Sequence, residues 1–164
     1  MPTIRIPVQR FSVISSKSFD SVVARLAAAI GHPDMNVFNR DVTAAKTYAE
    51  LEQVIYRAVG AFGLMEFARF DIGEILRKER GTETPRILRF VIGNPLIMKQ
   101  MAAHVPDAAS YAPVTILIDE RPEGVHVSYD RMAGYLAPYG NAEALKVAQH
   151  LDAKIEALLT AAAQ

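Results

Sequence analysis

The sequence contains no cysteine, so disulfide bonds, thiolate metal sites and cysteine nucleophiles are excluded. It also has no excess of basic charge, because Lys and Arg total 18 and Asp and Glu total 18. Domains that bind nucleic acids usually carry a basic patch or stripe, and none is visible along this chain. We therefore expect no nucleic-acid partner.

Long apolar segments are lacking as well. No uncharged apolar run approaches the roughly 20 residues that span a bilayer, and the opening residues MPTIRIPVQRF have no apolar core typical of a secretory signal. These absences predict a soluble, cytoplasmic protein without a membrane partner. The 51% hydrophobic and 22% charged residues are ordinary for a folded protein, and a length of 164 residues predicts one domain, 1–164.

Five helix starts are indicated by a side chain that can accept a hydrogen bond from the free amides of a first turn. Apolar residues then recur with helical spacing on one face. The predicted capping residues are Ser18, Thr47, Asp71, Asn94 and Asn141. The first four helices are expected to end near residues 31, 60, 81 and 103, and the last to run for roughly 20 residues. Residues 34–46 are predicted to be irregular.

Strand-forming residues dominate five segments: 8–14, 64–70, 86–92, 114–119 and 125–129. The last two flank ERPEG, a turn with Pro and Gly that predicts a hairpin. The order of elements lacks strict βαβ alternation. It predicts an α+β fold, with an antiparallel sheet of about five strands packed by helices.

Four segments carry a resemblance to a known family: GNPLIMKQM at 93–101, YAPVTILIDE at 111–120, VHVSYD at 125–130 and LDAKIEALL at 151–159. On these segments the chain resembles the domain of unknown function 302 family. The resemblance implies a β-α-β(4)-α order of the TATA-binding-protein-like type, with an extra helix because residues 34–62 look like an insertion. It implies no activity, since the family's name states none.

The resemblance also shows a departure. Many relatives have Arg-Pro-Ser after the Tyr-Asp pair, whereas this chain continues YDRMAGYL, with Met132 at the proline position. The loss of proline predicts a looser turn after Tyr129.

The turn at Gly93, Asn94 and Pro95 is the first candidate site. The structural requirements of a turn are enough to explain why these three residues occur here. Glycine tolerates unusual dihedrals, asparagine caps helices and proline suits a first helical position. The functional alternative is that free amides and the positive end of the helix dipole hold a carboxylate, phosphate or carbonyl group.

One face of the predicted sheet is the second candidate site. Side chains alternate along a strand, so Val114, Ile116 and Ile118 point to a core while their neighbours point away. The outer face would combine polar and apolar side chains, which predicts a pocket lining or a subunit interface. Its expected members are Thr115, Leu117, His126 and Ser128, with Glu66 and Arg89 if the strand register allows. Together the candidate ligand-binding residues are Gly93, Asn94, Pro95, Arg89, His126, Ser128, Tyr129 and Asp130.

Each of these residues also has an ordinary structural interpretation. Arg89 could pair with Glu66 across two strands, and His126 could be a half-exposed strand residue. Tyr129 could be a core aromatic with a bonded hydroxyl, and Asp71 a helix cap.

Three functions stay open on the sequence. The leading hypothesis is a non-enzymatic small-molecule-binding or assembly domain that forms a homodimer. The alternative is an enzyme acting on a small polar or anionic substrate, with Tyr129, Asp130, His126 or Asp71 for acid and base work. The third is a carrier of an apolar cofactor or lipid. Metal-binding histidine spacings and the common hydrolase and nucleotide motifs are missing, so we expect no metal and the cofactor is unknown.

Overall fold

The computed structural model describes residues 3–164 as a five-stranded antiparallel sheet packed by seven helices. The strands lie in the order β1-β5-β4-β3-β2, and this arrangement confirms the predicted α+β class. The strands are β1 (Arg10–Ser15), β2 (Met65–Asp71), β3 (Ile87–Gly93), β4 (Val114–Arg121) and β5 (Gly124–Asp130). The helices are α1 (Phe19–Ala29), α2 (Met35–Ala44), α3 (Tyr48–Ala58), α4 (Gly73–Arg80), α5 (Pro95–Ala102), α6 (Met132–Leu136) and α7 (Ala142–Ala163), with short 3-10 turns η1 (Pro106–Ser110) and η2 (Ala137–Tyr139).

All five predicted capping side chains accept a backbone amide. Their partners are Ser21 N for Ser18, Glu50 N for Thr47, Glu74 N for Asp71, Leu96 N for Asn94 and Ala144 N for Asn141. These bonds satisfy donors that a helix leaves without partners in its first turn.

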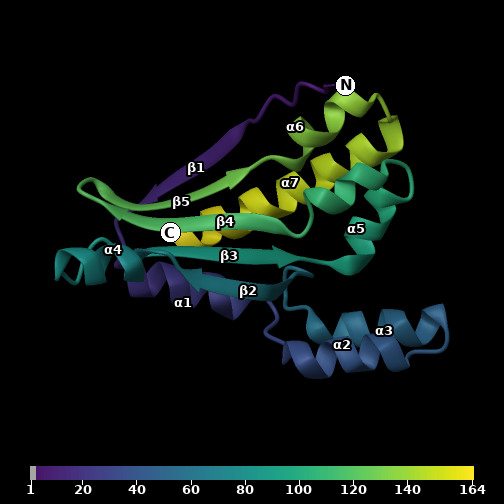
Figure 1. Ribbon diagram of the computed structural model, residues 1–164, viewed down its shortest axis with the longest axis horizontal. Helices are drawn as coiled ribbons and strands as arrows, with labels where there is room; N and C mark the ends of the chain where they lie inside the picture. Colours follow the sequence, from purple (N-terminus) through teal and green to yellow (C-terminus); the bar gives the residue numbers. More distant parts are fainter. Residues whose placement is uncertain (1–2) are drawn as a thin grey trace.

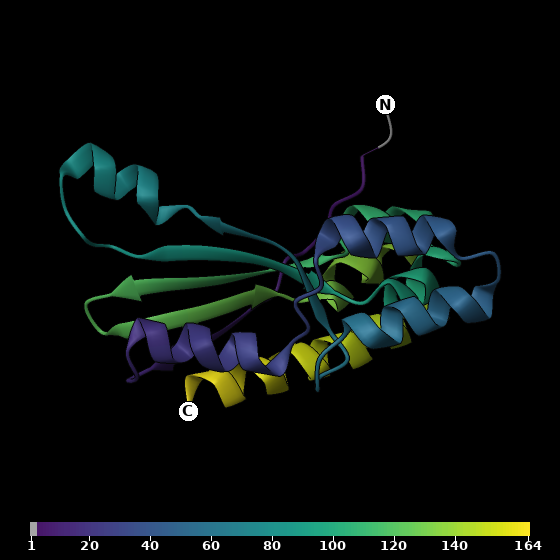
Figure 2. The ribbon, with the colours of Figure 1, turned by 90° about the horizontal axis from the view of Figure 1, so that it is seen from below.

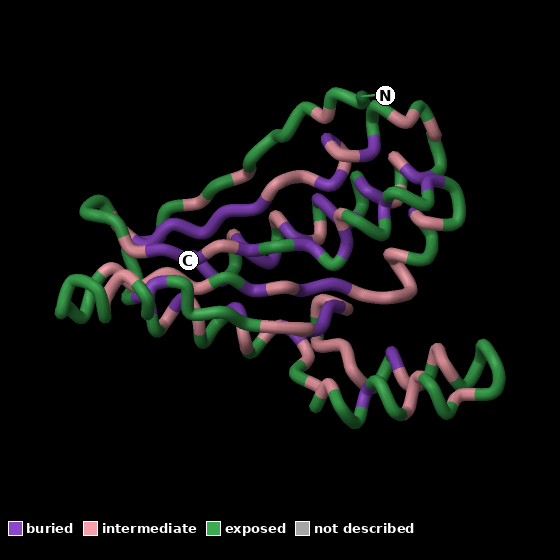
Figure 3. Tube along the Cα trace, viewed as in Figure 1, coloured by how far each residue is buried: buried purple, intermediate pink, exposed green. Residues whose placement is uncertain are grey.

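Helices α1 and α7 cover one face of the sheet, and the opposite face is left open. Figure 1 looks onto the open face, with α7 behind the strands, and the edge view in Figure 2 places α1 and α7 on one side and α4 on the other. The covered face forms the main core, which includes Phe90, Ile116, Ile118, Val127 and Leu158. Figure 3 shows buried residues along the central strands, whereas α4 is largely exposed.

The hairpin between β4 and β5 is tighter than predicted. The strands continue to Arg121 and resume at Gly124, so the loop contains only Pro122 and Glu123. Gly124 has φ +144°, a conformation that residues with a side chain rarely adopt, and this allows the short connection.

The prediction that residues 34–46 are irregular is wrong, because α2 occupies Met35–Ala44. Asp34 caps this helix by accepting from two backbone amides. Helices α2 and α3 form a hairpin around a second, smaller core built on Phe38, Ile55 and Met65. Asn, Val and Thr lower the helix propensity of this segment, whereas the Asp34 cap favours a helix start there.

The predicted loose turn after Tyr129 is also wrong, because α6 begins two residues after β5 ends. The Met132 amide donates to Asp152 Oδ1 at 2.7 Å, and the Ala133 amide donates to Asp152 Oδ2 at 3.0 Å. A proline at position 132 would lack the first of these donors. The departure from the family pattern therefore adds a hydrogen bond here.

No helix within residues 3–164 combines the length and apolar character needed to cross a bilayer.

Candidate functional site

Strand register brings a row of side chains together on the open face. Ser128 of β5 pairs with Leu117 of β4, and Leu117 pairs with Arg89 of β3. Ser12 of β1 and Phe70 of β2 extend this row to the two sheet edges. Because directly paired residues point to the same side of a sheet, all five belong to the open face.

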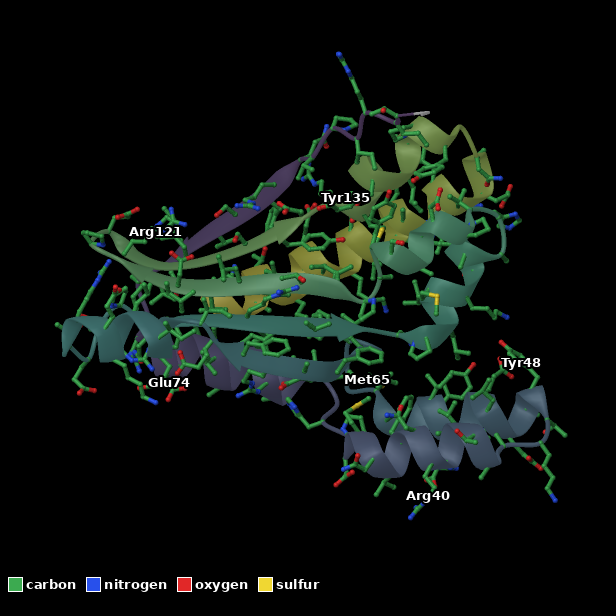
Figure 4. The ribbon with its side chains drawn as sticks, viewed as in Figure 1. Arg40, Tyr48, Met65, Glu74, Arg121 and Tyr135 are labelled. Carbon is green, nitrogen blue, oxygen red and sulfur yellow. The ribbon has the colours of Figure 1, made fainter. Side chains whose placement is uncertain are left out.

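A cavity of about 380 Å³ lies over Arg89, Leu117 and Ser128 of this row, and we refer to it as the open-face cavity. Tyr111 and Tyr135 line this cavity, and their rings stack with centroids 4.8 Å apart. Figure 4 shows Tyr135 where β5 passes into α6 and Arg121 at the opposite, hairpin end of the sheet. The remaining lining residues are Arg10, Arg89, Ser110, Pro113, Val114, Thr115, Leu117, Ser128, Tyr129 and Asp130.

The only carboxylate lining this cavity is already neutralised. Arg10 donates to Asp130 through Nε at 2.7 Å and through Nη2 at 2.8 Å, a two-bond ion pair between β1 and β5. Bidentate pairs of this kind are the stronger class of charged hydrogen bond. Asp130 therefore has little capacity left for a ligand.

Arg89, in contrast, has no carboxylate within ion-pair distance anywhere in residues 3–164. Its Nη2 makes one long contact, 3.5 Å to Thr115 Oγ1, and its guanidinium lies 5.9 Å from the ring centre of Phe70. A guanidinium has five N–H donors, so most of its donors are available.

Two hydroxyls add to the supply of donors. Within the described chain, neither Ser128 nor Tyr135 uses its hydroxyl in a hydrogen bond to protein, and Ser128 is 6% exposed. Burial raises the pKa of Tyr135, and the charge of Asp130 acts in the same direction. The phenol therefore stays protonated at neutral pH and remains a donor. The cavity as a whole is suited to a group rich in acceptors.

The GNP turn lies beside a different cavity. This second space, the α5 cavity, has a volume of about 90 Å³ and is lined mainly by apolar side chains, including Phe67, Ile97, Met98, Met101 and Leu151. Gly93, Asn94 and Pro95 form part of its wall.

The expectation of free amides at this turn is wrong. Asn94 Oδ1 accepts from Leu96 N at 2.8 Å, and Asn94 O accepts from Ile97 N and Met98 N. Asn94 Nδ2 donates to Gly63 O at 2.9 Å. The donors that could have held an anion are occupied by the protein's own groups, and an apolar hollow adjoins them.

His126 lies on the open face but outside the open-face cavity. It pairs in register with Asp119, nearer the hairpin, and is 7% exposed, so the expectation of a half-exposed residue is wrong. Its Nε2 lies 2.8 Å from Glu123 Oε1, although the two groups are not aligned for a hydrogen bond.

Glu66 and Arg89 do not share a face. The β2–β3 register shifts between Glu66 and Ala68, which places Glu66 opposite Ile92 of the covered face. Glu66 pairs with Arg69 and lies 3.1 Å from His32 Nδ1. The expected ion pair between Glu66 and Arg89 is therefore wrong, and the irregularity that separates them is a β-bulge invisible in the sequence pattern.

The Tyr129 side chain turns to the covered face. It is 1% exposed and its hydroxyl donates to Asp152 Oδ1 at 2.6 Å, which confirms the core-aromatic interpretation. Burial raises the pKa of Tyr129, and the adjacent carboxylate raises it further. Burial also raises the pKa of Asp152, against the effect of the hydrogen bonds donated to it.

The side chains considered for acid and base work do not converge. Tyr129 bonds to Asp152, Asp130 to Arg10, and Asp71 both caps α4 and pairs with Arg77. His126 stands apart near the hairpin. The open-face cavity is lined by Tyr129 and Asp130 but by neither His126 nor Asp71. Residues 3–164 also contain no cluster of three or more His, Asp or Glu side chains placed to hold a metal ion.

Sequence reasoning missed Arg10, Tyr111 and Tyr135 as members of the open-face cavity. The ion pair between Arg10 and Asp130 could have been predicted only if the β1–β5 register had been known. The two tyrosines come from segments beyond β3 and β5, and only the tertiary fold stacks them.

Comparisons with known proteins agree with this architecture. The family described as "Domain of unknown function DUF302" matches residues 39–162. The solved structure of an uncharacterised conserved protein DUF302 from Bacillus stearothermophilus is similar, with a TM-score of 0.64, 10% sequence identity, and coverage of 93% of this chain and 97% of that chain. At that identity the likeness shows the fold alone. No curated protein matches this sequence significantly.

The family match begins within residues 34–62, and the interpretation of that segment as an insertion into a single domain stays a prediction. The match covers most of the chain, which therefore belongs to the DUF302 family.

Proposed function

We propose that this protein binds a small organic anion on the open face of its sheet and does so without catalysing a reaction. The observation that carries the proposal is Arg89, which lines a cavity of about 380 Å³ and has no carboxylate partner among residues 3–164. Arg89 is exposed to solvent at this cavity, so its guanidinium is accessible and its free N–H donors can form charge-assisted hydrogen bonds with an anion from outside.

The surroundings of Arg89 favour a carboxylate. Ser128 and Tyr135 supply hydroxyl donors, while Leu117 and Tyr111 supply apolar surface for the rest of the molecule. A cavity volume of about 380 Å³ is within the usual range for small-molecule sites. A guanidinium matches the planar geometry of a carboxylate with two parallel hydrogen bonds.

The test compares Arg89→Met with the wild type in calorimetric titrations of butyrate, benzoate and inorganic phosphate. We expect a carboxylate to bind the wild type and to bind Arg89→Met at least about tenfold more weakly, because a charge-assisted bidentate contact is lost. Arg25→Met is the control, since Arg25 is exposed on α1, away from the cavity. Equal affinities of wild type and Arg89→Met, or no binding of any probe, would contradict the proposal.

The assembly part of the proposal is a homodimer. Its support is the apolar surface at the β2–α4 end, where Phe70, Ile72 and Ile75 are exposed and Ile75 reaches 73% exposure. Clustered apolar side chains of this kind favour contact with another surface. The cytoplasmic location stays a prediction that cell fractionation would test.

A further inference from the structure

We infer that the ligand is a straight-chain amphipathic carboxylate, whose head lies at Arg89 and whose alkyl tail passes Pro113 into the α5 cavity. This inference rests on the proposed function and names the substrate class of the same site. It adds a second, apolar subsite that the anion proposal does not require.

The two cavities flank the start of β4. Pro113 and Val114 line both the open-face cavity and the α5 cavity. Along β3, Arg89 borders the first and Gly93 the second. Arg89 and Gly93 are four positions apart on the strand, about 13 Å, a distance that a single extended alkyl chain can bridge.

The chemistry of the α5 cavity suits a hydrocarbon. No charged side chain lines it, and the polar groups of Asn94 are already bonded to Leu96 N and Gly63 O. A polar ligand group would therefore lose its hydration there without gaining a partner. Met98 and Met101 add flexible, polarisable walls that can adapt to a chain.

The size of the α5 cavity selects the end of a chain. Its volume of about 90 Å³ is smaller than the engineered apolar cavity of about 150 Å³ that accommodates benzene. It has room for terminal methylene and methyl groups and not for a ring. The larger polar cavity holds the head and the first part of the chain.

Gly93 offers a way to block the tail subsite. A Cβ atom at this position would lie 3.2 Å from Pro113 Cβ and 3.6 Å from Phe67 Cε2. These three residues line the α5 cavity, so the added methyl group would occupy the route of the tail. The φ of Gly93 is not in the positive region, so alanine is compatible with the backbone.

The experiment titrates butyrate and decanoate, both below their micellar concentrations, into the wild type, Gly93→Ala and Arg89→Met. In the wild type we expect decanoate to bind at least about tenfold more tightly than butyrate, since burial of each methylene contributes about 0.8 kcal/mol at most. In Gly93→Ala this advantage should disappear. Butyrate, which does not reach Gly93, reports whether the head site is intact, and Arg89→Met should weaken both ligands.

A second variant tests the tail subsite independently, in case Gly93→Ala fails to fold. Met98→Ala enlarges the α5 cavity, so dodecanoate should gain affinity relative to decanoate. The inference is overturned if butyrate and decanoate bind equally, or if neither Gly93→Ala nor Met98→Ala changes the preference for chain length. If butyrate binding still depends on Arg89, the anion site survives that result. If decanoate binds independently of Arg89, both proposals fail.

Discussion

Arg86 links three elements through one side chain. It donates to Glu120 through Nε at 3.1 Å and Nη2 at 2.9 Å, and to Asp20 through Nη1 at 2.7 Å. Its guanidinium lies 4.4 Å from the ring centre of Phe19. The start of β3, the end of β4 and the start of α1 are thereby held together. The hydrogen bonds from Arg86 lower the pKa of Glu120.

A lowered carboxyl pKa makes stability depend on pH. Folding favours the ionised form of Glu120, so its contribution is present above the pKa of the unfolded chain and lost as pH falls through the folded pKa. We expect Glu120→Gln to lower the free energy of unfolding by about 1 kcal/mol at pH 7. The difference from the wild type should shrink as pH falls below the ordinary glutamate range, measured by urea denaturation across pH.

The control for this prediction is Glu74→Gln, which removes an exposed pair with Lys78 on α4. Its effect at pH 7 should be smaller, because exposed pairs are screened by solvent. A Glu120→Gln deficit that stays constant from pH 7 to strongly acidic conditions would contradict the assignment.

At the scale of elements, Gly31 joins α1 to the sheet and to the α2–α3 hairpin. Its amide donates to Leu64 O, and its carbonyl accepts from Glu66 N. A Cβ atom at Gly31 would lie 1.8 Å from Ala58 O, a distance that no packing tolerates. Only glycine lets the end of α1 approach the end of α3 this closely.

We therefore expect Gly31→Ala to lower the free energy of unfolding by about 2 kcal/mol or more, as other overpacked sites do. Urea denaturation followed by circular dichroism measures the change. The exposed substitution Ala24→Ser on α1 is the matched control and should stay within about 0.5 kcal/mol of the wild type. Equal stability of Gly31→Ala and this control would show that the close approach is not maintained in solution.

Helix starts were predictable because a cap is a local device. The side chain and the amides that it accepts lie within three residues of each other, as for Ser18 and Asn141. Helix α2 carried a similar sign in Asp34, with Met35, Phe38 and Val42 spaced to lie on one face, and this pattern could have been found. Helix α6 carried none, because its first amides are held by Asp152 from a distant part of the chain.

At the scale of the whole molecule, the proposed homodimer places its contact at the β2–α4 end. Sedimentation at micromolar concentration should give the mass of a dimer for the wild type. Ile75→Glu should shift the protein to monomer, because a charge would be placed in the apolar contact. Tyr56→Glu is the control, since Tyr56 is an exposed apolar residue on α3, outside this surface. A wild type that remains monomeric at these concentrations would contradict the homodimer.

The candidate site was predicted in part. The alternation of β4 and β5 correctly separated the side chains of Val114, Ile116 and Ile118 from those of Leu117 and Ser128. The alternation does not indicate which strands are neighbours. The ion pair between Arg10 and Asp130, and the placement of Glu66 and Arg89 on opposite faces, were therefore not predictable from it.

The sequence by itself determined the helix caps, the hairpin, the α+β class and the two faces of each strand, because these depend on residues within a few positions of one another. Only the tertiary structure decided that the amides after Asn94 are bonded within the turn and that Arg89 has no carboxylate partner among residues 3–164. The physical reason is that hydrogen bonds and ion pairs of this kind depend on groups brought together from distant segments. Local sequence patterns do not indicate which distant segments come into contact.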